Sequence, residues 1–290
     1  MHTLLKISNL YIDISSDIDF PWTKDVSIFK VDAIDLSLCP NVLHCDIKIQ
    51  KDFPPIYGTL LYTSPLLDIM SVNGFEHCIH YLPTVREPFA LTVHNDSTHV
   101  TVYLDARAQN ALKWDRTLIG LFSLEHYYLP LNAFLLHSSY IIHEGEAVIF
   151  TAPSGTGKST QADLWKTYAG ADIINGDRTL LSYENGRWHA NGFPVCGSSD
   201  ICHNKTAPIK AIVCLNKAPE NHIVKRTKLQ LFHLLYSQSI HNSWNAEDTT
   251  MLTNHLSSIL SSVSVYDYYC TKEADAVSFL KNVIEQTKNK

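Results

Sequence analysis

A glycine-containing segment near the middle of the chain has the residue types that hold a nucleotide phosphate. Glycines let consecutive backbone N–H groups turn inward around an anion. The lysine that follows them, Lys158, would reach the β and γ phosphates of ATP, and the hydroxyl of Ser159 would ligate Mg²⁺. The residues expected to bind the nucleotide are Ala152, Pro153, Ser154, Gly155, Thr156, Gly157, Lys158, Ser159 and Thr160.

This segment departs from the strict phosphate-loop pattern at its first position, where Ala152 replaces a glycine. Alanine is tolerated there if its φ is negative. The competing interpretation is an ordinary glycine-rich turn between a strand and a helix, with an exposed lysine. The order of Gly155, Gly157, Lys158 and Ser159 favours the phosphate loop.

An aspartate and a histidine outside the segment could complete a phosphoryl-transfer site. Such transfer requires neutralised charge on the γ phosphate and in-line placement of the nucleophile. Asp177 could ligate Mg²⁺ and deprotonate the attacking hydroxyl, or His137 could accept that proton. The alternative roles are a turn aspartate and a packed or solvated histidine. Arg178 could contact phosphate or form a surface salt bridge.

Around these residues the chain resembles the bacterial HPr kinase/phosphorylase family. His137 precedes Gly145 and the Ser154-Gly-Thr-Gly-Lys-Ser segment at the family's spacing, without a gap. The chain is similar in more detail to the small HPr-kinase-like proteins, which include kinases that phosphorylate lasso-peptide precursors on serine. The matching motifs, within residues 135–215, are Ala152 to Thr160, Ala162-Asp163-Leu164-Trp165, Asn175-Gly176-Asp177-Arg178 and Gly197-Ser198-Ser199.

The resemblance implies an α/β fold with a P-loop-containing, phosphoenolpyruvate carboxykinase-like (HPr kinase C-terminal) catalytic domain. It also implies an ATP- and Mg²⁺-dependent kinase that transfers the γ-phosphoryl group to a hydroxyl, namely a serine of a peptide or small protein. Lys158, Asp177 and His137 would be its catalytic residues, and Ser159 and Asp177 would ligate the metal.

Two departures from the family narrow this expectation. HPr kinases carry two adjacent aspartates where this chain has Gly176 and Asp177, so one carboxylate is left for two tasks. The segment associated with the phosphorylase reaction is not recognisable, so we expect kinase activity without the reverse reaction. Two other function classes stay open: a non-catalytic nucleotide-binding regulatory protein, and a small-molecule kinase on the same scaffold.

Other clusters of reactive residues give weaker signals. Cys196, Cys202 and His203 could be three zinc ligands, but they lack a fourth ligand and buried thiols are the favoured interpretation. The segment from Gly197 to Asp200 could be a substrate or metal loop or a plain connection. The tyrosines near residue 268 are expected in the core rather than on a base-stacking surface.

Elements that would position these residues follow from the hydrophobic pattern. An apolar run over 147–151 predicts a strand buried on both faces, and the helix after the loop can end at Gly170. Further strands are expected from Ile173, over 179–184 and 187–191 as a hairpin, over 210–215 and over 263–270. Helices are expected over 228–241 and 248–260, with a final helix that Thr271 can cap.

The first part of the chain has a different pattern and predicts a separate, β-rich α+β domain over 1–130, followed by the kinase domain over 131–290. Period-two alternation over 43–49 and 100–104 indicates half-buried antiparallel strands. Helical spacing runs from Arg107 to Tyr128, with Leu112 and Leu118 on its apolar side. The role of this domain is unassigned, and recognition of the phosphate acceptor is the expected one.

Composition excludes several function classes. Residues 1–140 contain 15 acidic and nine basic residues, and the remainder contains 14 of each, so neither part has the basic excess of a nucleic-acid-binding protein. Neither a signal peptide nor a membrane span is recognisable, and the seven scattered cysteines indicate reduced thiols, so we expect a cytoplasmic location. The oligomeric state stays open.

Overall fold

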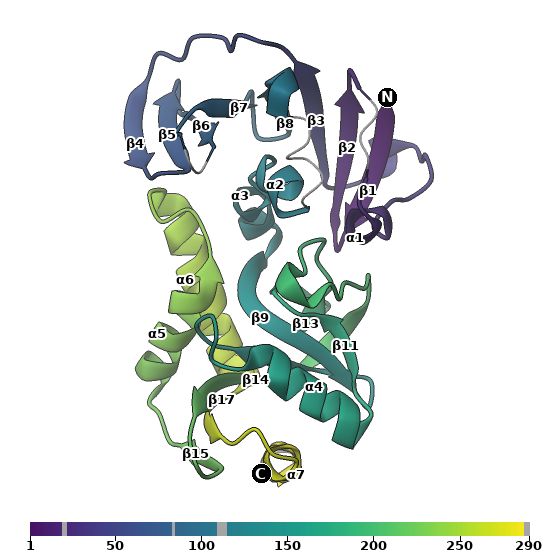
Figure 1. Cartoon of the computed structure of the whole chain (residues 1–290), viewed down its shortest axis with the longest axis vertical. Coiled ribbons are helices and arrows are strands. Elements are labelled where there is room, and N and C mark those ends of the chain that lie inside the picture. The colour runs from purple at the N-terminus through teal and green to yellow at the C-terminus, as the bar shows by residue number, and fades with distance from the viewer. Residues whose placement is uncertain (19–21, 83–84, 109–114, 287–290) are drawn as a thin grey trace. The chain divides into compact units, whose positions relative to one another are not determined.

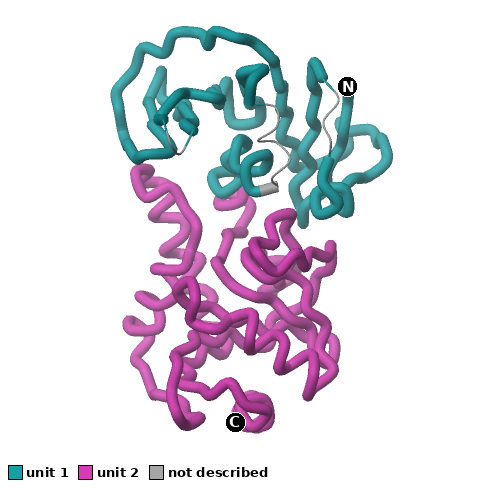
Figure 2. The backbone as a smooth tube through the Cα atoms, in the orientation of Figure 1, with its two compact units in different colours: residues 1–127 teal, residues 128–290 magenta. Residues whose placement is uncertain are grey.

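The computed structural model describes residues 1–18, 22–82, 85–108 and 115–286. The protein is a mixed α/β chain that divides into two compact units, Met1–Tyr127 and Tyr128–Lys290 (Figure 2). Each unit contains one large sheet (Figure 1). None of the helices in the described ranges is long and apolar enough to cross a membrane.

Unit 1 is built on an eight-stranded sheet with the order β1-β2-β3-β8-β7-β6-β5-β4. Its strands are β1 (His2–Ile7), β2 (Leu10–Ser16), β3 (Val42–Ile49), β4 (Thr59–Thr63), β5 (Leu67–Val72), β6 (Phe75–Tyr81), β7 (Pro88–His94) and β8 (His99–Leu104). Its helices are α1 (Lys24–Ser27), η1 (Leu36–Leu38), α2 (Asp115–Gly120) and α3 (Leu124–Tyr128), the last of which crosses into unit 2 by one residue.

The expectation of purely antiparallel pairing is wrong for β3, which pairs in parallel with both β2 and β8. Alternation of buried and exposed residues is the same in both kinds of ladder, so it does not reveal strand direction. The direction follows from the connections. A segment of 25 residues, 17–41, carries α1 and η1 and joins β2 to β3, and four strands separate β3 from β8 in the chain.

The single helix expected from Arg107 to Tyr128 is two short helices in the described part. Ser123 lies between α2 and α3 with a φ of +50°, which ends the regular helical path. Leu118 and Phe122 are buried as the spacing predicted, whereas Leu112 lies outside the described residues.

Unit 2 is built on nine strands, of which β10-β9-β12-β13-β14-β17-β15 form a continuous path, while β11 and β16 also pair with β9. These strands are β9 (Ala133–His143), β10 (Glu146–Thr151), β11 (Asp172–Asn175), β12 (Arg178–Glu184), β13 (Arg187–Asn191), β14 (Thr206–Lys217), β15 (His222–Val224), β16 (Ser239–Ile240) and β17 (Ser264–Cys270). The helices are η3 (Leu129–Leu131), α4 (Lys158–Ala169), η4 (Gly197–Ser199), α5 (Lys228–Gln238), α6 (Ala246–Ser262) and α7 (Asp275–Gln286).

Strand β9, which the sequence pattern did not predict, lies between β10 and β12, with β12 and β11 paired along one edge and β16 and β10 along the other. Residues up to His137 pair with β12, and residues from Ser138 onward pair with β10. The end of β10 and the start of β12 therefore lie beside neighbouring residues of β9, one on each of its edges. Figure 1 shows β9 as a long, curved strand through the middle of the unit.

Two hydrophobic clusters cover opposite faces of this sheet. One contains Ile149 and residues of α5 and α6, and the other contains Phe150 and residues of α4 and α7. Alternate residues of β10 enter different clusters, which confirms the prediction of a strand buried on both faces. The predicted hairpin is also confirmed, with Asn185 and Gly186 at φ values of +51° and +83° in its turn.

Two boundaries in unit 2 differ from the predicted ones. The helix α5 ends at Gln238, because Ser239 and Ile240 pair with β9 instead. The helix α7 begins at Asp275, so Thr271 is not its N-cap. Thr271 accepts a hydrogen bond from the N–H of Glu273 at 3.3 Å and donates one to the Asp275 carboxylate at 3.2 Å, which makes it a turn residue before the helix.

A buried histidine makes the stability of unit 1 dependent on pH. His94 is 6% exposed, its Nδ1 lies 2.8 Å from the hydroxyl of Tyr127, and the two rings stack. Burial, with added repulsion from His126, lowers the pKa of His94 to about 3. The folded unit thus resists a proton that the unfolded chain accepts below about pH 6.5.

We expect the free energy of unfolding of unit 1 to decrease as pH falls from about 6.5 towards 4, by up to about 1.4 kcal/mol per pH unit from His94. The dependence of this free energy on pH is measured by urea denaturation at several pH values, with hydrogen exchange of unit 1 peptides as the readout. His94→Gln should flatten this slope. His99→Gln should not, because His99 is exposed at the start of β8, the other strand of the same hairpin. Equal slopes for wild type and His94→Gln would contradict the assignment.

Candidate active site

The loop between β10 and α4 has an open, glycine-dependent conformation. Gly155 and Gly157 have φ values of +76° and +124°, which L-residues rarely adopt, and no atom lies within 4 Å of where a Cβ would be at either position. Gly157 precedes α4, and no side chain caps this helix. The first N–H groups of the helix therefore face the loop and can serve an anion.

Replacement of the first glycine of the phosphate-loop pattern by Ala152 is accommodated. The residues with positive φ in the described chain do not include Ala152, and its side chain is buried in the cluster beside α4. The departure seen in the sequence does not distort the loop.

Lys158 begins α4 and is 7% exposed. Its Nζ donates a hydrogen bond to the carbonyl oxygen of Ala152 at 2.9 Å, which folds the side chain over the loop and leaves two ammonium protons for other acceptors. Burial lowers the pKa of Lys158, and attraction to Asp177 opposes that shift. Ser159, the next residue, is exposed at the start of the helix.

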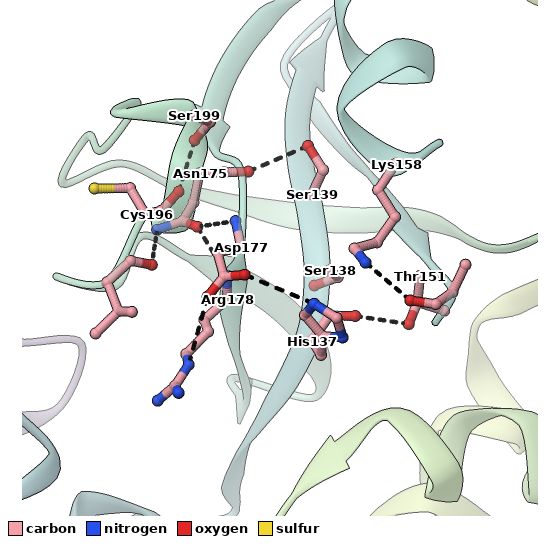
Figure 3. A network of polar contacts seen from close by, with 12 residues as sticks. His137, Ser138, Ser139, Thr151, Lys158, Asn175, Asp177, Arg178, Cys196 and Ser199 are labelled. Carbon is pink, nitrogen blue, oxygen red and sulfur yellow. Dashed lines mark hydrogen bonds and ion pairs between the residues drawn. The ribbon is translucent and has the colours of Figure 1, made fainter. Parts of the chain in front are cut away.

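The pairing of β9 with β11 and β12 brings His137 and Asp177 together. His137 is opposite Arg178 in the ladder, and the N–H of Ser138 donates to the carbonyl oxygen of Asp177 at 3.0 Å. The Nε2 of His137 lies 3.6 Å from one carboxylate oxygen of Asp177, and the Nε of Arg178 lies 3.7 Å from the other (Figure 3). The carboxylate is thus held between an imidazole and a guanidinium.

Burial is the main cause that lowers the pKa of His137, and the positive charge of Lys158 adds to it. The Asp177 carboxylate and a hydrogen bond with Gln238 oppose the shift. The imidazole is therefore mainly neutral at pH 7 and can accept a proton. Lys158 therefore lies within electrostatic range of both His137 and Asp177.

The hydroxyl of Thr151 donates to the backbone carbonyl of His137 at 2.9 Å, which fastens the base of the loop to β9. Sequence reasoning missed Thr151 and Gln238 as members of the site, since neither belongs to a motif. Asn175 belongs to the Asn175-Gly-Asp-Arg motif, but the sequence alone assigned it no role of its own. Its position two residues before an aspartate in a turn was an available signal, because asparagine side chains cap such turns.

Gly176 explains why the chain has one aspartate here. A Cβ on residue 176 would lie 2.1 Å from the hydroxyl oxygen of Ser199, which donates a hydrogen bond to the Cys196 carbonyl at 2.7 Å. An aspartate at 176 is therefore incompatible with this packing. The space that a second carboxylate side chain would need is filled by the segment carrying η4.

The 197–200 segment packs against the side chain of Asp177 through Gly197. A Cβ on Gly197 would come within 2.9 Å of the Cβ and Cγ atoms of Asp177, so a glycine there lets the backbone approach the carboxylate. The structure brings the sulfurs of Cys196 and Cys202 within 4.8 Å of one another, but His203 is exposed and belongs to no cluster of metal-type ligands among the described residues, so the hypothesised set of three zinc ligands is not assembled. Tyr268 is in the core, as expected, and stacks on Phe279.

No protein-family model and no curated protein matches this chain. Among solved structures, it is similar to the Hpr(Ser) kinase/phosphatase from Coxiella burnetii at 14% sequence identity and a TM-score of 0.23, over 31% of this chain and 76% of that chain.

The contact at Gly176 gives a testable consequence for stability. Gly176→Ala should lower the free energy of unfolding by about 1–3 kcal/mol, as overpacking does, and Ser199→Gly in the same chain should recover most of that loss. Urea denaturation of the two single variants and the double variant measures the coupling. Gly120→Ala is a control, because no atom lies within 4 Å of a Cβ there. Additive effects of the two substitutions would contradict the predicted clash.

Proposed function

We propose that this chain is an ATP- and Mg²⁺-dependent kinase that transfers the γ-phosphoryl group to a serine hydroxyl of a peptide or small protein. The observation that carries the proposal is the joining of an open anion-binding loop to the His137–Asp177 pair. Lys158 lies close enough to both residues to influence the charge of His137 and to be attracted by Asp177.

The polar groups around the loop are of the types that bind ATP phosphates and Mg²⁺. Uncapped N–H groups at the start of α4, the two glycines and the Lys158 ammonium are donors that phosphate oxygens accept. The exposed Ser159 hydroxyl and the Asp177 carboxylate, which is 27% exposed, are oxygen ligands of the kind Mg²⁺ takes. In line with the resemblance of residues 135–215 to the HPr kinase family, residues 131–290 would form a phosphoenolpyruvate carboxykinase-like domain of the HPr kinase type.

In the proposed reaction the bond between the γ phosphorus and the bridging oxygen of ATP breaks, and a bond from phosphorus to the acceptor oxygen forms. Mg²⁺, when bound, neutralises charge on the phosphates. Lys158 stabilises the charge of the transferred group, and Asp177 or His137 takes the proton of the acceptor hydroxyl. ADP and the phosphorylated acceptor are the products.

Binding of Mg-ATP at the loop is the first consequence to test. A hundredfold excess of ligand over its dissociation constant should stabilise the fold by about 2.7 kcal/mol, read as an increase in melting temperature. Lys158→Ala should remove this shift, and Lys166→Ala, an exposed lysine on the same helix, should keep it. A wild-type chain whose melting temperature does not respond to saturating Mg-ATP has no nucleotide role at this loop.

The second test identifies the proton acceptor. Asp177→Asn should abolish transfer of labelled phosphate while largely sparing ATP binding, because an amide neither carries the charge nor takes the proton. Asp172→Asn, at an exposed position in the same region, should be active. If His137 is the base, the rate should fall as pH decreases through its lowered pKa. His137→Gln should be strongly impaired, and its residual rate should lack that pH dependence. Normal turnover of Asp177→Asn would overturn its role.

A second candidate function is nucleotide binding without catalysis. The observation that favours it is Gly176. Ser199 occupies the space that a side chain at residue 176 would need, so the site has a single carboxylate there. Incubation with labelled ATP and candidate acceptors distinguishes the two, because a regulatory protein would show the thermal shift but no labelled product. A labelled small molecule with unlabelled peptides would instead indicate a small-molecule kinase.

Unit 1 would select the acceptor. Residues 1–127 contain the whole acidic excess, with 15 acidic against nine basic residues, and such a field attracts positively charged partners. We expect a basic serine-containing peptide to be phosphorylated with a lower KM than an acidic one, and the difference to shrink as salt shortens the Debye length below about 8 Å. A preference for acidic peptides at low salt would contradict this role.

A further inference from the structure

Asn175 is the last residue of β11 and is completely buried. Its side-chain oxygen accepts hydrogen bonds from the N–H groups of Asp177 and Arg178, at 2.8 and 2.9 Å. Its side-chain nitrogen donates to the carbonyl oxygens of Phe193 and Val195, at 2.7 and 3.1 Å. Because two donors meet the oxygen and two acceptors meet the nitrogen, the orientation of the amide is determined.

The four hydrogen bonds connect the two segments that enclose the Asp177 carboxylate. On one side, the Asn175 oxygen closes the turn that carries Asp177 from β11 into β12. On the other, the Asn175 nitrogen holds the stretch that leads from Phe193 to Gly197, the residue that packs against the carboxylate. Ser139 adds a third link by donating to the Asn175 carbonyl at 3.3 Å (Figure 3).

We infer that Asn175 is a positioning residue that sets the Asp177 carboxylate against His137. It touches neither nucleotide loop nor His137 in the described contacts, so it would act through Asp177 alone. This inference rests on the proposed kinase function for its effect on rate, but its structural part does not. A buried amide that loses one of its partners leaves a donor or acceptor unsatisfied, so the turn cannot shift at small cost.

Comparison of Asn175→Ala with Asn191→Ala tests the inference. Asn191 is also buried in unit 2 and also donates twice, to the Leu180 carbonyl and the Ser182 hydroxyl, but none of its side-chain hydrogen bonds among the described residues reaches the Asp177 turn. In Asn175→Ala the amides of Asp177 and Arg178 should exchange with solvent at least about tenfold faster, and transfer should fall by about 100-fold, as expected for a shift of about 1 Å. The KM for ATP should change less than about threefold, since the loop is not altered. Asn191→Ala should lose stability without these effects.

A conservative variant separates positioning from loss of folding. Asn175→Ser keeps a hydroxyl that can accept from the N–H of Asp177 in the same kind of turn, so it should restore part of the amide protection and of the rate. It also serves as the working variant if Asn175→Ala does not fold. Protection and turnover in both Asn175 variants equal to those of Asn191→Ala would overturn the inference. If the wild type transfers no phosphate, the proposed function fails, and the exchange measurements alone still decide the role of Asn175.

Discussion

The backbone of β9 has to satisfy its hydrogen bonds along its full length inside the protein, and the geometry of the site depends on how it does so. Buried N–H and C=O groups almost always find partners. Along one edge of β9 they find them in β12 and β11, and along the other edge in β16 and β10. The loop with Gly155 and Gly157 follows β10 and the Asp177 turn precedes β12, so β9, which pairs with both strands at His137 and Ser138, brings the two together.

The charges of the side chains gathered beside β9 determine which ligand they can bind. Lys158 and Arg178 are cationic, Asp177 is anionic and His137 is mainly neutral, so the four side chains carry a net positive charge. Burial disfavours the charged forms of Lys158 and His137, and Asp177 compensates both only in part. An anionic ligand in the loop would supply the missing negative charge, so the cluster is better suited to bind phosphate than to close on itself as an ion-pair network.

The sequence predicted the local features of unit 2 well, because they depend on neighbours along the chain. Gly170, with a φ of +65°, ends α4 as expected, and the Asn185-Gly186 turn forms the expected hairpin. Strand β9 was missed since polar residues such as Ser138 and Ser139 interrupt its apolar pattern, although both are fully buried and hydrogen-bonded. The direction of β3 was also beyond reach, because alternation is the same in parallel and antiparallel ladders.

For the site itself, residue types indicated which groups could take part, but not which backbone contacts constrain them. The clash that excludes a side chain at Gly176 involves Ser199, more than 20 positions away, and only the folded chain shows it. The same packing bears on the division of tasks in the proposed kinase. A carboxylate that ligates a divalent cation is a weaker proton acceptor. With no second aspartate to share the work, Asp177 would serve the metal, and the neutral His137, 3.6 Å from it, is the base best placed to receive the proton of the acceptor.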